Sequence, residues 1–163
     1  GLTSATATTN VARLEGFQAA IEANYPGIEI VDVAYSESNP QTAASNVDNW
    51  LTKYPNLDGI FAIDGTNASG AAAALQAKNL VGKIALVGYD AYPANVELIK
   101  SGVFTALIAQ DPAAEARLAI RTLVDFIKNG TKPGARDVVI PNVILDANTS
   151  AEDLAKYTYV ATN

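Results

Sequence analysis

The sequence predicts an α/β fold with an open, parallel sheet and helices on both faces of that sheet. Short, continuously apolar segments alternate along the chain with longer segments whose apolar residues recur at three- and four-residue steps. This alternation indicates parallel strands joined by right-handed helical crossovers. The 163 residues, 49% hydrophobic and 17% charged, suffice for one ordered domain but hold too few strand–helix units for a closed barrel.

The first third of the chain predicts a helix, a strand and a second helix. Residues 10–24 carry an apolar stripe at helical spacing, and the turn-forming residues 25–27 end it. Residues 28–35 alternate between apolar and polar side chains and are rich in β-branched residues, which predicts a strand. Pro40 begins the second helix. The stripes of the two helices are Val11, Leu14, Phe17 and Ile21, and Ala44, Val47 and Leu51.

The middle of the chain repeats this unit. Residues 60–63 form a short apolar run, typical of a strand buried in a parallel sheet. Helices are then expected at residues 68–78 and 96–100, each followed by a strand, at residues 84–88 and 105–109.

The longest helix is expected between Pro112 and Asn129, with Asp111 as its N-cap. An extended segment at residues 138–145 and a brief helix at residues 151–156 follow. The stripe of the long helix that is expected to face the core consists of Leu118, Thr122 and Phe126.

The N-terminal residues 1–9 read as a loop that follows a strand, so the first strand of the domain is expected upstream of Gly1. Without that strand, the sheet would keep an unpaired edge or a groove. Another segment, or a neighbouring chain, is expected to fill it.

Composition excludes several classes of function. The chain contains no cysteine and no histidine, which excludes disulfides, zinc–thiolate sites and Ser-His-Asp catalysis. A net charge of −6 and a pI near 4.5 repel phosphate backbones, so no nucleic-acid partner is expected. No apolar run approaches the ~20 residues of a membrane-spanning helix.

Acceptor-rich residues follow three predicted strands: Asp64, then Tyr89 and Asp90, then Gln110 and Asp111. Ligands bind at the carboxyl ends of strands in such sheets, and carboxylates and amides suit a hydroxylated or aminated small molecule. Asp111, directly before a proline, is better explained as an N-cap. Asp64 and Asp90 fit a ligand role and a turn or cap role equally well.

Three further features have competing interpretations. Arg13 stands one turn into the first helix, where it could reach the same edge and clamp ligand oxygens, although a solvated arginine is the commoner case. Residues 65–70 have the glycine spacing of a phosphate loop, but Ala71 and Ala72 replace the lysine and hydroxyl residue, so the glycines are expected to serve packing. Trp50 is expected to pack rather than to stack on a ligand.

Four motifs, in this order along the chain, resemble those of the ribose-binding-protein-like type 1 periplasmic solute-binding proteins. The resemblance covers nearly the whole chain. It implies that residues 1–163 form a single flavodoxin-like lobe, the second lobe of a two-lobed protein about twice this length. The motifs are residues 13–17 (RLEGF), 54–62 (YPNLDGIFA), 87–90 (VGYD) and 108–112 (IAQDP).

The resemblance also implies roles for three of the residues. Arg13 matches an arginine that donates hydrogen bonds to sugar oxygens, Asp90 matches an aspartate that accepts from adjacent hydroxyls, and Gln110 matches the glutamine of the final strand.

The chain departs from ribose binders at three places. Asp64 stands where they usually have asparagine, and Tyr89 replaces the commoner phenylalanine. No aromatic residue is present around Ser38 and Asn39, where ribose binders place a ring that stacks on the sugar. Because of these departures, the resemblance does not identify the ligand.

The leading hypothesis is therefore non-catalytic binding of a sugar or polyol, without a cofactor. The resemblance implies cleft closure against a missing N-terminal lobe or a neighbouring chain, and delivery to the membrane permease of an ABC transporter. It implies a periplasmic or extracytoplasmic location, reached by a signal peptide in the precursor, with a lipid anchor in a Gram-positive source.

Two alternatives remain open at this stage. One is the effector-sensing domain of a lac-repressor-type transcription factor, which shares this fold. The other is a glycoside hydrolase that uses the carboxylates of Asp64 and Asp90.

Overall fold

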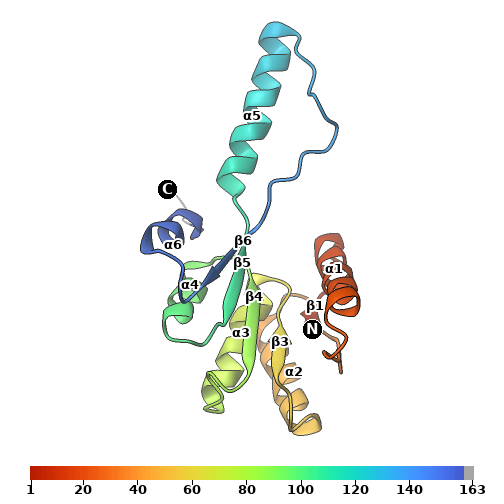
Figure 1. The fold of residues 1–163 in the computed structure, drawn as a ribbon, viewed down its shortest axis with the longest axis vertical. Helices are drawn as coiled ribbons and strands as arrows, with labels where there is room; N and C mark the ends of the chain where they lie inside the picture. Colours follow the sequence, from red (N-terminus) through yellow and green to blue (C-terminus); the bar gives the residue numbers. More distant parts are fainter. Residues whose placement is uncertain (160–163) are drawn as a thin grey trace.

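The computed structural model describes residues 1–159. Figure 1 shows a lobe of strands and helices from which one long helix projects. No helix among the described residues combines the length and apolar character that crossing a lipid bilayer requires. The elements are β1 (Leu2–Thr3), α1 (Thr8–Asn24), β2 (Ala34–Tyr35), α2 (Pro40–Lys53), β3 (Gly59–Phe61), α3 (Gly65–Ala77), β4 (Ala85–Tyr89), α4 (Pro93–Lys100), β5 (Ala106–Ala109), α5 (Pro112–Asn129), β6 (Val143–Asp146) and α6 (Ala151–Tyr157).

The predicted α/β architecture with a parallel sheet is confirmed. Strands β3, β4 and β5 pair in parallel in that order, and β1 pairs in parallel with β2. A bridge between Leu2 and Ala62, the residue after β3, aligns β1 beside β3. The last strand, β6, pairs antiparallel with β5, which the extended pattern of residues 138–145 did not indicate.

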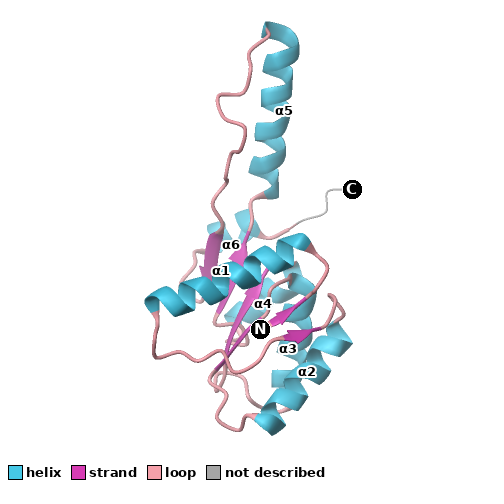
Figure 2. Ribbon diagram, turned by 90° about the vertical axis from the view of Figure 1, so that its right-hand side faces the viewer, coloured by secondary structure: helices cyan, strands magenta, loops and turns pink. Residues whose placement is uncertain are grey.

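Helices cover both faces of the strands, as expected. Right-handed crossovers place α1 on one face and α2, α3 and α4 on the other, and α1 lies in front of the strands in Figure 2. Phe17 of α1 packs on Phe61 of β3, with ring centroids 4.5 Å apart. On the other face, Trp50 is buried, as predicted. A Cβ at Gly70 of α3 would collide with the carbonyl oxygen of Pro40, so this glycine does serve helix packing.

The prediction of a loop throughout residues 1–9 was wrong at β1. Leu2 and Thr3 are buried and lie between Ala34 and Ala62, where the backbone of Leu2 accepts a hydrogen bond from Ile63. The first strand of the sheet therefore includes Leu2–Thr3. The groove that another segment or chain was expected to fill is occupied by these residues.

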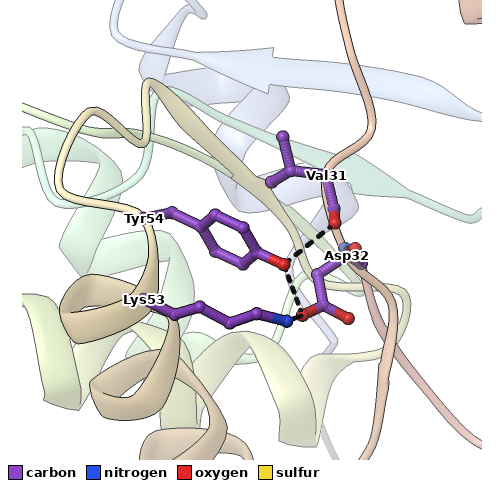
Figure 3. A network of polar contacts seen from close by, with 5 residues as sticks. Val31, Asp32, Lys53 and Tyr54 are labelled. Carbon is purple, nitrogen blue, oxygen red and sulfur yellow. Dashed lines mark hydrogen bonds and ion pairs between the residues drawn. The ribbon is translucent and has the colours of Figure 1, made fainter.

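Only the end of the predicted strand at residues 28–35 forms a ladder, because its partner β1 consists of two residues. Side chains hold the preceding extended stretch against α2 instead, as Figure 3 shows. The ammonium of Lys53 lies 3.1 Å from Oδ2 of Asp32. The hydroxyl of Tyr54 lies 3.0 Å from the same oxygen and 3.1 Å from the carbonyl of Val31. These donors, Lys53 first, lower the pKa of Asp32.

The prediction that α5 faces the core was also wrong within this structure. None of its residues is buried, and Phe126 is 50% exposed. The helix stands clear of the lobe in Figures 1 and 2. Its amphipathic pattern indicates that one face requires an apolar partner, but the described residues do not supply one. A second exposed stripe, at three- and four-residue spacing, consists of Ile120, Leu123, Val124 and Ile127.

The contacts of Asp32 predict a stability that depends on pH. Asp32→Asn should lower the free energy of unfolding of the full-length protein by about 0.5 kcal/mol at neutral pH, the range of a partly exposed ion pair. Because folding lowers the pKa of Asp32 from its ordinary 3.8, this stabilisation is present above pH 3.8 and is lost as pH falls through the folded-state pKa.

Denaturant unfolding of both proteins at neutral pH and at about pH 2 measures this difference. Asp48→Asn is the control, because the carboxylate of Asp48 makes one long contact among residues 1–159, 3.7 Å from the ammonium of the exposed Lys78. An effect of Asp32→Asn that stays constant between the two pH values would contradict the assignment.

Candidate ligand-binding site

The five residues predicted for the site lie together at the carboxyl edge of the parallel strands. The register of the ladders brings the ends of β3, β4 and β5 level, and Asp64, Asp90 and Gln110 follow these ends. Arg13 reaches the same edge from α1 and contacts Tyr89 at the end of β4. The predicted proximity is therefore confirmed, while the role of each residue in binding a ligand stays a prediction.

Asp90 connects the ends of three neighbouring strands. Its Oδ2 accepts from the backbone N–H of Gly65 at 3.1 Å, and its Oδ1 accepts from Nε2 of Gln110 at 2.7 Å. The hydroxyl of Tyr159 lies 3.4 Å from Oδ1. Asp90 does not cap the following helix, whose N-cap residue is Tyr92. Asp90 is therefore not the N-cap of the helix that follows it, but it does have the φ of a turn residue, 67°, and its carboxylate accepts from the first N–H of α3; its ligand role stays a prediction.

Asp64 is the N-cap of α3, so the capping interpretation is confirmed for this residue. Its Oδ1 accepts from the backbone N–H of Asn67 at 2.8 Å. Its Oδ2 accepts from the side-chain amides of Asn10 and Asn67, at 2.8 and 3.0 Å, and from the hydroxyl of Ser38 at 2.8 Å. A carboxylate has about four acceptor sites. A ligand donor would thus have to displace one of these protein donors.

Arg13 is held in place by two contacts. Its Nη1 donates to the carbonyl of Ile63 at 3.0 Å, and its Cζ lies 3.7 Å from the centroid of the Tyr89 ring. The hydroxyl of Tyr89 in turn accepts from Nδ2 of Asn142 at 2.6 Å. The other N–H groups of the guanidinium make no hydrogen bond to a described residue, and they are free to donate to ligand oxygens.

Ser38, in the loop between β2 and α2, contacts Asp64, and the backbone of this loop is strained. Glu37 and Ser38 have φ values of 49° and 55°, in the left-handed region that is unfavourable for residues with a Cβ. The Glu37 carboxylate stabilises this turn by accepting from the backbone of Ala5 at 2.9 Å and from the hydroxyl of Ser4. The Ala5 N–H makes the largest contribution to lowering the pKa of Glu37.

Sequence reasoning missed several residues of this network. Asn67 follows the N-cap Asp64 by three residues, the position whose backbone N–H an N-cap side chain accepts from, and its side-chain amide donates to the same carboxylate. Tyr159 accepts from the backbone N–H of Gln110, 49 residues away, and no local pattern identifies such a partner. The cap assigned to Asp111 is confirmed by its contact with the backbone N–H of Ala114 at 2.8 Å.

The charges at the edge favour a neutral, hydroxylated ligand. Two carboxylates, those of Asp64 and Asp90, and one guanidinium, that of Arg13, lie at this edge, so its net negative charge would repel an anion. The arrangement does not suit a glycoside hydrolase, because Asp64 caps α3 and its acceptor positions are taken by four donor groups of the protein, which leaves no free oxygen to attack or protonate a glycoside.

Comparisons with known proteins agree with the fold. The family model described as "Periplasmic binding protein domain" matches residues 3–132. The ribose import binding protein of Haemophilus influenzae is 34% identical over 133 residues, which are 81% of this chain and 44% of that protein. The D-allose-binding periplasmic protein of Escherichia coli is 33% identical over 82 residues, 50% of this chain and 26% of that protein.

A solved structure has the same fold. The periplasmic solute binding protein of an ABC transporter from Actinobacillus succinogenes, with bound D-allose, superposes with a TM-score of 0.80 and 28% identity over 96% of this chain and 53% of that one. The chain thus spans less than half the length of the curated relatives it matches. Since the family model covers most of its residues, this chain belongs to the periplasmic binding protein domain family.

Proposed function

We propose that this chain is one lobe of a non-catalytic sugar- or polyol-binding protein. The observation that carries the proposal is the carboxylate of Asp90, 9% exposed and oriented by Gly65 and Gln110 at the edge where α/β sheets bind ligands. Arg13 supplies donors beside this acceptor. Sugar hydroxyls both donate and accept, so they match the pair.

The relatives support the ligand class and the transport role. Their names describe binding of ribose and D-allose, and the solved relative belongs to an ABC transporter. On this proposal the full-length protein binds its ligand outside the cytoplasm and presents it to a membrane permease. A lipid anchor would hold it at the membrane in a Gram-positive source.

The exposed helix α5 supports a two-lobed arrangement with this chain as the second lobe. Its exposed stripe includes Ile127, 71% exposed, and Val139 in the following segment is 87% exposed. Apolar side chains gathered in this way normally have a partner. In the solved relative, the chain corresponds to 53% of the length. We propose that the first lobe packs against the apolar face of α5 and closes over the carboxyl edge of the strands.

Truncation of Asp90 tests the ligand site. In the full-length protein, Asp90→Ala should weaken the tightest sugar of a panel of D-allose, D-ribose, D-xylose and D-arabinose by about 2 kcal/mol, or ~30-fold, because desolvated ligand hydroxyls lose their acceptor. Isothermal titration calorimetry measures the affinity, and Asp48→Ala on α2 should leave it unchanged. Wild-type affinity in Asp90→Ala, or no binding of any panel sugar by the wild type, would contradict the proposal.

A charge on α5 tests the two-lobed arrangement. Ile127→Asp should destabilise the full-length protein by about 2 to 4 kcal/mol, because it would bury a carboxylate in the contact between the lobes. Ile28→Asp, at an apolar residue that is also exposed but lies beyond the end of α1, should change stability by less than about 0.5 kcal/mol. Equal denaturant midpoints for the two variants would speak against the contact.

A further inference from the structure

One aromatic residue at the edge of the site has no role in the network described above. Tyr92 follows β4 by three residues and is the N-cap residue of α4, where Pro93 opens the helix. Its side chain makes no capping hydrogen bond. Although the residue lies among the packed ends of the strands, it is 42% exposed.

Two neighbours fix the orientation of the Tyr92 ring. The ring lies directly over Gly65, the first residue of α3, where any Cβ would collide with it. Its edge meets Tyr159 in a T-shaped arrangement, with centroids 5.9 Å apart and an interplanar angle of 77°. Such pairs are favourable beyond the area they bury.

Tyr159 is itself hydrogen-bonded to backbone groups of the site. Its backbone N–H donates to the carbonyl of Ala91 at 2.9 Å, and its hydroxyl accepts from the backbone of Gln110 at 3.0 Å. The orientation of Tyr92 is therefore linked, through Tyr159 and Gly65, to the same backbone groups that orient Asp90 and Gln110.

The Tyr92 hydroxyl belongs to the electrostatic environment of the site. Burial first, and then the charges of Asp90 and Asp64, raise the pKa of Tyr92, while the charge of Arg13 opposes the increase. The hydroxyl makes no hydrogen bond to another described residue. A neutral phenol that faces the charged groups of a site, with its own donor unused, is available to a ligand.

We infer that Tyr92 is a ligand-contacting residue of the proposed sugar site. Its exposed ring surface would pack on the C–H face of the sugar, and its hydroxyl would donate to a sugar oxygen. Gly65 and Tyr159 would act as positioning residues. The loop at Ser38 and Asn39 carries no aromatic side chain, and Ser38 is committed to Asp64. Tyr92 thus supplies a ring from the segment between β4 and α4. The inference rests on the proposed function.

Calorimetric titration of the full-length protein with the four panel sugars tests the inference. Tyr92→Ala should weaken the tightest sugar by about tenfold or more, because ring and hydroxyl are both lost. Tyr92→Phe keeps the ring and should lose less, about three- to tenfold. Tyr25→Ala, at an exposed tyrosine beyond the far end of α1, is the matched control and should retain wild-type affinity.

The possible outcomes separate the two proposals. If Asp90→Ala weakens binding while Tyr92→Ala binds all four sugars with wild-type affinity, the role of Tyr92 is refuted and the sugar site stands. If no panel sugar binds the wild type, the proposed function fails first. Thermal unfolding of the unliganded variants distinguishes a purely structural role, since Tyr92→Phe should unfold at the wild-type temperature while it still loses affinity. Equal affinities of Tyr92→Phe and wild type would remove the hydroxyl from the site.

Discussion

The hydrogen bonds of the Asp90 carboxylate are the interaction on which the geometry of the site depends. They join the start of α3, through Gly65, to the end of β5, through Gln110, and so connect the ends of three neighbouring strands. The backbone of Asp90 turns away from β4 with a φ of 67°, while its N–H still donates to Ile108 at 2.9 Å. A buried carboxylate is tolerated only with such donors. The sheet itself therefore preorganises the polar edge.

Much of the fold could be predicted, because alternating helical and strand periodicities are local properties. The failures at β1 and α5 concern contacts that are not local. Strand β1 has two residues, too few to show a period, and it is a strand only because Leu2 pairs with Ala34 and bridges Ala62. The amphipathic pattern of α5 was recognised correctly, but a pattern identifies the apolar face and not the surface that covers it. The core-facing assignment of Phe126 failed for that reason.

The residues of the site likewise divide into those that local sequence could predict and those that it could not. Residues that directly follow strands could be placed from the sequence, since parallel strands end at one edge. The choice between cap and ligand residue for Asp64 could not be made, because both roles require the same carboxylate. Only the partners distinguish them: Asp64 accepts from the N–H of Asn67 in the helix that follows it, as an N-cap does, whereas Asp90 accepts from Gly65 and Gln110, which follow the two neighbouring strands. Tyr159 could not be predicted as a neighbour of the site, because the chain returns to this edge of the sheet only after α6.

The course of the chain around α5 links the proposed cover of that helix to the site. The segment of residues 111–141, which contains α5, leaves the lobe just after Gln110 and returns to it at Asn142. Gln110 contacts Asp90, and Asn142 donates to the hydroxyl of Tyr89. The two ends of the segment are adjacent, because Ala109 of β5 pairs with Val143 of β6. A first lobe that holds α5, as proposed, would be joined to this lobe at these two connections, and its movement would change the angle between them. Since Tyr89 also supports Arg13, such a movement would act directly on the residues that orient the guanidinium and the carboxylate. In the proposed two-lobed protein, closure of the first lobe would therefore be coupled to the geometry of Arg13 and Asp90 through the covalent chain.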